Sequence, residues 1–279
     1  MGLLIRFARQ WVAGERMEDA LRAAAVVNVK GVDAVVNHLG EHYRERARVD
    51  ATLQEYLGLL EAMKRARIRG CVSVKPTQLG VMIDRAYSLS LFLQVLDASK
   101  ASGRSLWLDM ESAATTDDIL WLYERLLERD AGVGVCLQAN LRRTHDDVER
   151  LLDLGGRIRL TKGAYRETPE VAFQERTEVD REFLRLLDIL FRRGRHFAVA
   201  SHDGRMIERA LELSRIHDAP FEFQMLQGVR DSLKAELVRR SFHVAEYIPY
   251  GPAWLSYFSR RLRERPRNVF TMVRSFVSG

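Results

Sequence analysis

The stretch from Tyr257 to Asn268, YFSRRLRERPRN, places two arginines side by side near the C-terminus. If it forms a helix, four polar residues share one face at positions i, i+3, i+4 and i+7, namely Tyr257, Arg260, Arg261 and Glu264. Two adjacent guanidinium groups can bind a carboxylate or a phosphate through paired hydrogen bonds. The residue types alone leave two interpretations open, an anion clamp or a solvated basic surface.

Polar residues that could bind or react with a ligand also follow short apolar runs throughout the chain. They are Lys75, Asp109, Glu111, Gln138, Lys162, Tyr165, Ser201, His202, Gln224 and Tyr247. Arg159 lies inside such a run, RIRLTKG. A strand that is covered on both faces carries a charge only where a ligand or a partner side chain satisfies it. Each residue alone has an ordinary explanation as a cap or loop residue, but their recurrence at the same end of successive runs indicates a site.

The apolar runs alternate with longer amphipathic segments. Eight runs are candidate strands, at residues 33–40, 70–75, 105–110, 132–139, 157–163, 196–201, 221–226 and 242–248. Segments between them, such as TDDILWLYERLLER, have apolar residues at the three- and four-residue spacing of helices. The alternation predicts an α/β fold, a parallel (β/α)8 barrel of the TIM type. Active sites of such barrels lie at the carboxyl ends of the strands, where the polar residues occur.

No linker or change of composition divides the chain. We therefore expect a short N-terminal helical segment at residues 1–30 and one catalytic barrel at residues 31–279. The length of 279 residues suits a barrel of roughly 250 residues. Cys71 and Cys136 each lie inside an apolar run, which predicts buried thiols in a reducing compartment.

The chain has a net charge of +6, with positive and negative residues mostly interspersed. This excess permits binding to acidic partners but does not require it. The sequence has no apolar run of membrane-spanning length and no signal-peptide pattern, so we expect a soluble cytoplasmic protein.

Three further interpretations follow from the residues. Lys162 at a strand end could form a Schiff base with a carbonyl substrate, as in aldolase-type barrels. The arginine-rich tail could bind nucleic acid, although the sequence contains no recognised nucleic-acid motif and we expect no such partner. His38 and His42 have the i, i+4 spacing of metal ligands, but they lie across a strand end, and we expect no metal.

Several motifs resemble the proline dehydrogenase family in its short monofunctional bacterial form. Besides YFSRRLRERPRN they are VSVKPTQLG (72–80), WLDMES (107–112), CLQANLRRT (136–144), RLTKGAYRE (159–167), FEFQMLQGVR (221–230) and EYIPYG (246–251). The resemblance runs in order from about residue 30 to the C-terminus. It implies a distorted, flavin-containing (β/α)8 barrel that oxidises L-proline to 1-pyrroline-5-carboxylate, the first step of proline catabolism to glutamate, and passes the electrons to a membrane quinone.

The resemblance also implies roles for individual residues. Asp109 and Arg159 would be catalytic, with Arg159 against the reactive part of the flavin, where a fixed positive charge favours the electron-rich reduced ring. The implied substrate-binding residues are Lys75, Tyr165, Leu226, Tyr247, Tyr257, Arg260 and Arg261. Those implied to hold a non-covalent FAD are Met110, Gln138, Arg159, Lys162, Gly163, Ala164, Ser201 and His202. The implied reaction is hydride transfer to flavin N5 from the ring carbon next to the proline nitrogen.

By the same resemblance, Glu41 would pair with Arg260 as a gate over the bound substrate. Two residues depart from the family pattern: Asn37 stands where an aspartate is expected, and Asn140 where an aromatic residue is common. Asn37 could alter the floor of the site and Asn140 the flavin contacts. The implied metabolic partner is a separate pyrroline-5-carboxylate dehydrogenase, and the quinone implies peripheral association with the inner membrane.

Overall fold

The computed structural model describes residues 10–255 and Tyr257. Eight parallel strands close into a barrel in which each strand pairs with its neighbours in chain order and β8 pairs with β1. The strands are β1 (Asp33–His38), β2 (Gly70–Val74), β3 (Leu106–Leu108), β4 (Gly134–Gln138), β5 (Arg157–Thr161), β6 (Phe197–Val199), β7 (Phe221–Leu226) and β8 (Val244–Tyr250). The predicted (β/α)8 barrel and its eight strands are therefore confirmed.

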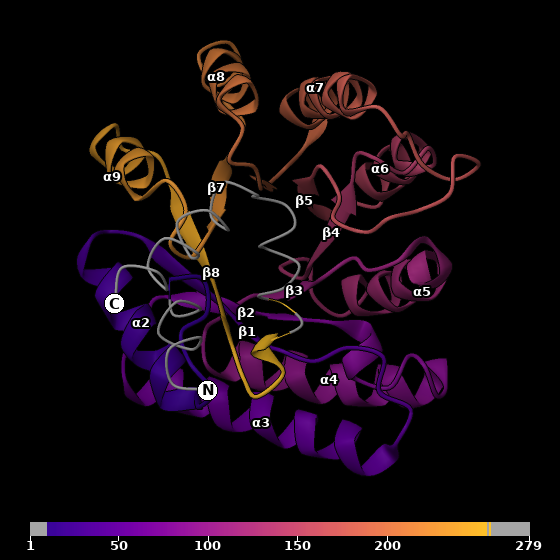
Figure 1. Cartoon of the computed structure of the whole chain (residues 1–279), viewed down its shortest axis with the longest axis vertical. Coiled ribbons are helices and arrows are strands. Elements are labelled where there is room, and N and C mark those ends of the chain that lie inside the picture. The colour runs from indigo at the N-terminus through magenta and orange to yellow at the C-terminus, as the bar shows by residue number, and fades with distance from the viewer. Residues whose placement is uncertain (1–9, 256, 258–279) are drawn as a thin grey trace, which may run out of the picture.

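Helices surround the strands as an outer layer (Figure 1). Within the described residues they are α2 (Met17–Val29), α3 (Arg46–Arg65), α4 (Arg85–Ala101), α5 (Thr116–Leu127), α6 (Thr144–Asp153), α7 (Arg176–Arg193), α8 (Gly204–Leu213) and α9 (Asp231–Arg239), with short 3-10 turns η1 (Pro76–Gln78) and η2 (Ala113–Thr115). Local sequence fixes several helix starts. At α4, for example, the Asp84 carboxylate accepts a hydrogen bond from the Tyr87 backbone N–H (2.7 Å), which satisfies a donor of the first turn.

Within the described residues, the first helix begins at Met17. Residues 10–16 form an irregular segment, although the amphipathic pattern predicted helix there. The α2 helix packs against β1 and β8, beside α3 and α9 in Figure 1. The eighth strand has the predicted length but begins and ends two residues later than predicted, because its pairing with β1 continues to the His38 and Tyr250 pair.

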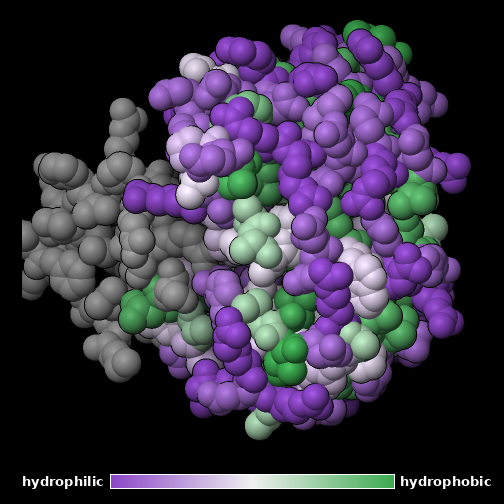
Figure 2. Space-filling model, turned by 90° about the vertical axis from the view of Figure 1, so that its right-hand side faces the viewer, coloured by the Kyte–Doolittle hydropathy of each residue, from purple (hydrophilic) through white to green (hydrophobic). Residues whose placement is uncertain are grey.

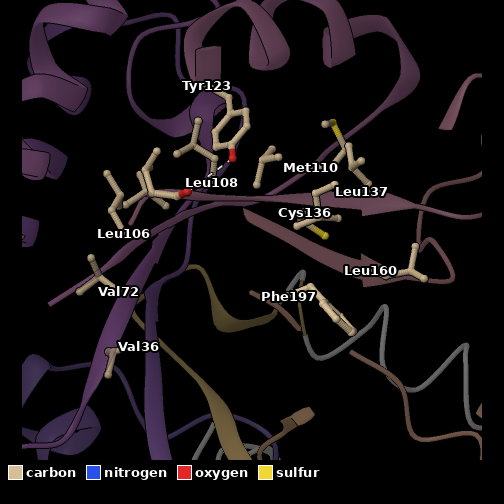
Figure 3. Close-up of a cluster of buried hydrophobic side chains, with 14 of the residues drawn as sticks. Val36, Val72, Leu106, Leu108, Met110, Tyr123, Cys136, Leu137, Leu160 and Phe197 are labelled. Carbon is tan, nitrogen blue, oxygen red and sulfur yellow. Dashed lines mark hydrogen bonds between the residues drawn. The ribbon is translucent and has the colours of Figure 1, made fainter. Parts of the chain in front are cut away.

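Alternation along the strands separates two layers of buried side chains. Outward-facing residues pack against the helices in the main hydrophobic core, part of which appears in Figure 3, with Val36, Val72, Leu106 and Leu160 on the strands and Tyr123 on α5. A smaller cluster lies inside the barrel and consists of Val35, Cys71, Trp107, Ala198 and Ala245. The period of two residues in a strand produces this division, and it sends every second residue of each strand toward the barrel interior.

The cysteines and the surface also agree with the sequence. Cys71 and Cys136 are buried free thiols. The face shown in Figure 2 is largely hydrophilic, with hydrophobic residues scattered among polar ones. In the part of the chain that the structure describes, no helix is both long enough and apolar enough to cross a bilayer.

Candidate active site

A cavity of about 1080 Å³ opens at the carboxyl ends of the strands. The predicted site residues that line it come from all eight βα units: Glu41, Lys75, Asp109, Met110, Gln138, Arg159, Lys162, Gly163, Ala164, Tyr165, Ser201, His202, Leu226, Tyr247 and Tyr257. Arg260, Arg261 and Glu264 lie outside the described residues. The fold therefore brings together every predicted site residue that the structure describes, as expected for a barrel.

Asp109 forms the centre of a buried polar cluster at the base of the cavity. One carboxylate oxygen accepts hydrogen bonds from the Ser73 hydroxyl (2.5 Å) and from the Arg159 guanidinium. The other accepts from Lys75 Nζ (3.1 Å) and the Tyr247 hydroxyl (2.6 Å). Four donors from three strands, β2, β5 and β8, thus converge on one carboxylate, which suits a fixed anion that positions its neighbours rather than a proton acceptor.

The charges in this cluster stabilise one another. Burial alone would raise the pKa of Asp109, but Lys75 and Arg159 lower it well below its usual range. Burial likewise opposes the charge on each cation, yet the Asp109 carboxylate raises the pKa of Lys75 and that of Arg159. Burial and Asp109 together raise the pKa of the Tyr247 phenol. The cluster therefore holds two cations and one anion near neutral pH, with a net positive charge.

Arg159 is fixed from several directions. Its side chain is almost fully buried and donates to Gln224 Oε1 (3.1 Å) and Ser73 Oγ (3.0 Å) in addition to Asp109. The guanidinium carbon also lies 5.1 Å from the centre of the Trp107 ring, which is a cation–π contact. Such a group is preorganised, because its orientation is set before any ligand arrives.

A second buried carboxylate anchors the loop after β1. Burial raises the pKa of Glu111, which accepts hydrogen bonds from the Thr77 backbone N–H (2.9 Å) and hydroxyl (2.6 Å). Thr77 in turn accepts from the backbone N–H groups of His42 (Oγ1, 2.9 Å) and Tyr43 (carbonyl, 2.9 Å). The neighbouring Glu41 lines the cavity. Its carboxylate lies 3.4 Å from the Tyr165 hydroxyl.

Lys162 projects from the end of β5 toward two carboxylates. Its Nζ donates to Asp180 on α7 and to Asp203 (2.6 Å), the residue that caps α8. A Schiff-base lysine needs a neutral amine that can reach a carbonyl carbon, whereas this nitrogen is held in a double ion pair. The aldolase interpretation of Lys162 therefore loses its structural basis.

The wall of the cavity after β4 and β5 is built partly from backbone and amide groups. Gln138 Nε2 donates to the Glu111 carbonyl (2.8 Å), and its Oε1 accepts from the Ala164 N–H (3.3 Å). Gly163 has φ +110°, and a Cβ there would overlap the Asn140 amide. Only glycine tolerates this conformation and this approach. Asn140, one of the two residues that depart from the family pattern, thus packs directly against Gly163.

The other departure, Asn37, is fully buried and does not line the cavity. Its amide donates to the Ser73 carbonyl (2.9 Å). It therefore reaches the site only through the strand that carries Ser73 and Lys75, so it does not form the floor directly.

On the β6 and β7 side, His202 Nε2 accepts a hydrogen bond from the Leu226 N–H (2.9 Å). The His202 carbonyl accepts from Arg230 (2.7 Å). These bonds tie the loop after β6, which also carries Ser201, to the end of β7.

The sequence reasoning did not assign roles to four residues that the structure brings into the site. Ser73 and Gln224 contact Arg159, and Asp180 and Asp203 hold Lys162. Ser73 precedes Lys75 by two residues, so strand alternation could have placed both on one face. The carboxylates of Asp180 and Asp203 give no comparable signal. Among the described residues, no group of three or more His, Cys, Asp or Glu side chains could hold a metal ion.

Comparison with known proteins places these features in a family. The family model described as proline dehydrogenase matches residues 20–273. Proline dehydrogenase 1 of Bacillus subtilis (strain 168) is 30% identical over 273 residues, which cover 97% of this chain and 90% of the relative. The proline dehydrogenase of Deinococcus radiodurans is 33% identical over 281 residues, covering 98% of this chain and 90% of the relative.

A solved structure has the same fold. Proline utilization A (PutA) from Bdellovibrio bacteriovorus superposes with a TM-score of 0.84 at 22% identity over 92% of this chain. This chain covers only 32% of that longer protein. The family match extends over nearly the whole chain and agrees with the curated relatives, so the chain belongs to the proline dehydrogenase family.

Proposed function

We propose that the protein oxidises L-proline to 1-pyrroline-5-carboxylate with a non-covalently bound FAD and passes the electrons to a quinone. The observation that carries the proposal is the buried cluster of Lys75, Asp109, Arg159 and Tyr247 at the base of the cavity. Its net positive charge, held in a site largely shielded from water, suits a small amino acid that enters with a carboxylate.

The residues present fit a flavin dinucleotide. The cavity volume of about 1080 Å³ lies at the upper end of the roughly 300–1,000 Å³ of ligand pockets, so both a large cofactor and a small substrate are accommodated. Arg48 and Arg176 line its rim with mostly exposed side chains, and these cations suit a diphosphate. Met110, Gln138, Lys162, Gly163, Ala164, Ser201 and His202 would hold the rest of the cofactor.

A bound FAD would supply the hydride acceptor for the ring carbon next to the substrate nitrogen. The side chain of Arg159 supplies a fixed positive charge where electron density increases. Lys75, with Arg260 and Arg261, would bind the substrate carboxylate and so orient the ring. Asp109 would keep Lys75 and Arg159 in place. Tyr165, Leu226, Tyr247 and Tyr257 would form the walls around the ring and exclude water.

The partners of the reaction belong to the same proposal. The electron acceptor would be a membrane quinone, which a cytoplasmic protein reaches by peripheral association with the inner membrane. The product would pass to a separate pyrroline-5-carboxylate dehydrogenase. Glu41 would act as a gate over the substrate together with Arg260.

The test is proline-dependent reduction of the bound flavin. The purified protein should be yellow, and its flavin absorbance should bleach when proline is added without another reductant. Arg261→Ala should raise the KM for proline by about 10- to 150-fold, because a hydrogen bond to a charged group contributes about 1.5–3 kcal/mol.

Arg263→Ala is the matched control, since Arg263 lies two residues further along the same arginine-rich stretch and, at the helical spacing expected from the sequence, falls off the face of Tyr257, Arg260 and Arg261. Its KM should stay within about twofold of the unmodified protein. An equal rise in both variants would reject the clamp. A colourless protein that borohydride traps with a carbonyl compound would reject the oxidation itself.

A further inference from the structure

The irregular segment before α2 packs against residues that line the cavity. Trp11 and Val12 are buried in a hydrophobic cluster that is separate from the main core. The other members of this cluster come from the loops that follow β1, β7 and β8, namely Leu39, Val229, Trp254 and Tyr257. Two of them, Leu39 and Tyr257, also line the cavity. The N-terminal segment therefore shares a packed cluster with the cavity wall.

Hydrogen bonds fix this segment to the end of β8 and to the residues that follow it. The Ala13 N–H donates to the Pro249 carbonyl (2.9 Å), and the Gly251 N–H donates to the Gly14 carbonyl (2.9 Å). The Trp254 indole N–H donates to Glu15 Oε1 (2.8 Å). Backbone and side-chain bonds thus hold residues 10–15, here called the strap, beside the turn that leads into Tyr257.

The loop after β7 is shaped to receive the strap. Gly228 has φ +66°, and a Cβ at this position would overlap the Gln10 carbonyl oxygen. The overlap is with backbone, so no side-chain rotation relieves it, and any larger residue must displace one of the two chain segments. Gly228 belongs to the same loop as Val229, which packs in the cluster.

We propose that the strap positions the Tyr257 side of the substrate pocket, with Trp11 as the positioning residue packed in the cluster with Trp254 and Tyr257. The proposal rests on the proposed function, in which Tyr257 contacts the substrate. Apart from Arg48 on α3, the residues proposed to hold FAD lie in or after β3 to β6, whereas the strap packs against and hydrogen-bonds to the side built from β1, β7 and β8. Displacing the strap should therefore weaken proline binding and leave cofactor binding intact.

Gly228→Ala tests the proposal directly, and Gly103→Ala is its matched control. Gly103 has a nearly identical φ of +69°, but a Cβ there meets no atom within 4 Å. Both variants carry the same backbone penalty for alanine in a left-handed conformation. Only Gly228→Ala should raise the KM for proline, by about tenfold, with kcat and flavin content within about twofold of the unmodified protein.

Acrylamide quenching of tryptophan fluorescence measures displacement of the strap independently of activity. Trp11 and Trp254 are only 3% and 7% exposed, so quenching should increase in Gly228→Ala and not in Gly103→Ala. A second pair of variants removes only the indole bond: Glu15→Ala should raise the KM, and Glu15→Gln, which retains an acceptor oxygen, should restore it.

Three results would overturn the proposal: increased quenching with an unchanged KM, equal effects of the two glycine variants, or a loss of flavin that accompanies the rise in KM. If the unmodified protein did not oxidise proline, the proposed function would fail, whereas quenching would still show whether the strap is seated as the structure has it.

Discussion

Asp109 shows how a single residue organises this site. Its carboxylate accepts hydrogen bonds from Ser73 in β2, from Lys75 directly after β2, from Arg159 in β5 and from Tyr247 in β8. The carboxylate therefore compensates one of the two positive charges, and the second remains to attract an anionic ligand. Removing it would leave Lys75 and Arg159 buried without their common anion.

We expect Asp109→Asn to lower the free energy of unfolding by about 3–5 kcal/mol, because removing one partner of a buried ion pair leaves the other charge buried without compensation. Denaturant unfolding measures this loss. Asp117→Asn is the control, since the Asp117 side chain is 75% exposed and its ion pair with Arg143 should contribute less than about 1 kcal/mol. Similar losses in both variants would show that Asp109 does not compensate the two cations.

At the scale of elements, the loop between β1 and α3 is anchored so that it holds a predicted site residue, Glu41, at the cavity. Thr77 anchors the backbone of His42 and Tyr43, and Glu111 in turn fixes Thr77. His42 has φ 60°, a left-handed conformation that is uncommon for a residue with a side chain. The anchored, strained turn presents Glu41 to the cavity beside Tyr165.

Because this loop holds Glu41 in place, we expect Glu41→Ala to raise the KM for proline by about threefold to tenfold, a loss of about 1 kcal/mol typical of one polar contact. Steady-state kinetics with a dye acceptor measures the change. Glu45→Ala serves as the control, since Glu45 is exposed in the same loop and pairs with Arg48 on the surface. Unchanged substrate affinity and turnover in Glu41→Ala would reject the gate.

At the scale of the whole molecule, the barrel has two separate polar ends. Trp107 lies between them, with the guanidinium of Arg159 on the active-site side and that of Arg157 4.7 Å from the ring centre on the other. Arg157 lines a second cavity of about 640 Å³ at the amino ends of the strands. There it donates to His196 Nε2 (2.8 Å) and to Glu222 (3.3 Å).

This second end should make stability depend on pH. Burial, together with the nearby Arg157 and His243, lowers the pKa of His196 to about 4. The unfolded chain takes up a proton on this residue near pH 6.5, whereas the folded chain does not. Stability should therefore fall as the pH decreases from about 6.5 toward 4.

His196→Gln removes the titration and keeps a hydrogen-bond acceptor for Arg157. As the pH is lowered, we expect the free energy of unfolding of the unmodified protein to fall more than that of this variant. Urea unfolding midpoints at several pH values measure it. A difference that stays constant across this range would show that His196 is not held neutral by the fold.

The sequence by itself determined the architecture and the position of the chemistry. Eight apolar runs alternating with amphipathic segments predicted the barrel, because strand and helix periodicities are local properties. The polar residues after those runs, from Lys75 to Tyr247, had to meet because carboxyl ends of parallel strands share one rim. Family motifs then indicated proline dehydrogenase, and the family match confirmed it.

Only the tertiary structure decided which of those residues contact one another. The Tyr247 hydroxyl reaches Asp109 across 138 residues of sequence, and Lys162 pairs with carboxylates from α7 and from the N-cap of α8. The helical pattern before Met17 was wrong for residues 10–16, because burial of Trp11 and Val12 against Trp254 and Tyr257 overrides local propensity. Such contacts depend on closure of the barrel, which brings the end of β8 beside residues 10–15, and no local spacing in the sequence encodes that approach.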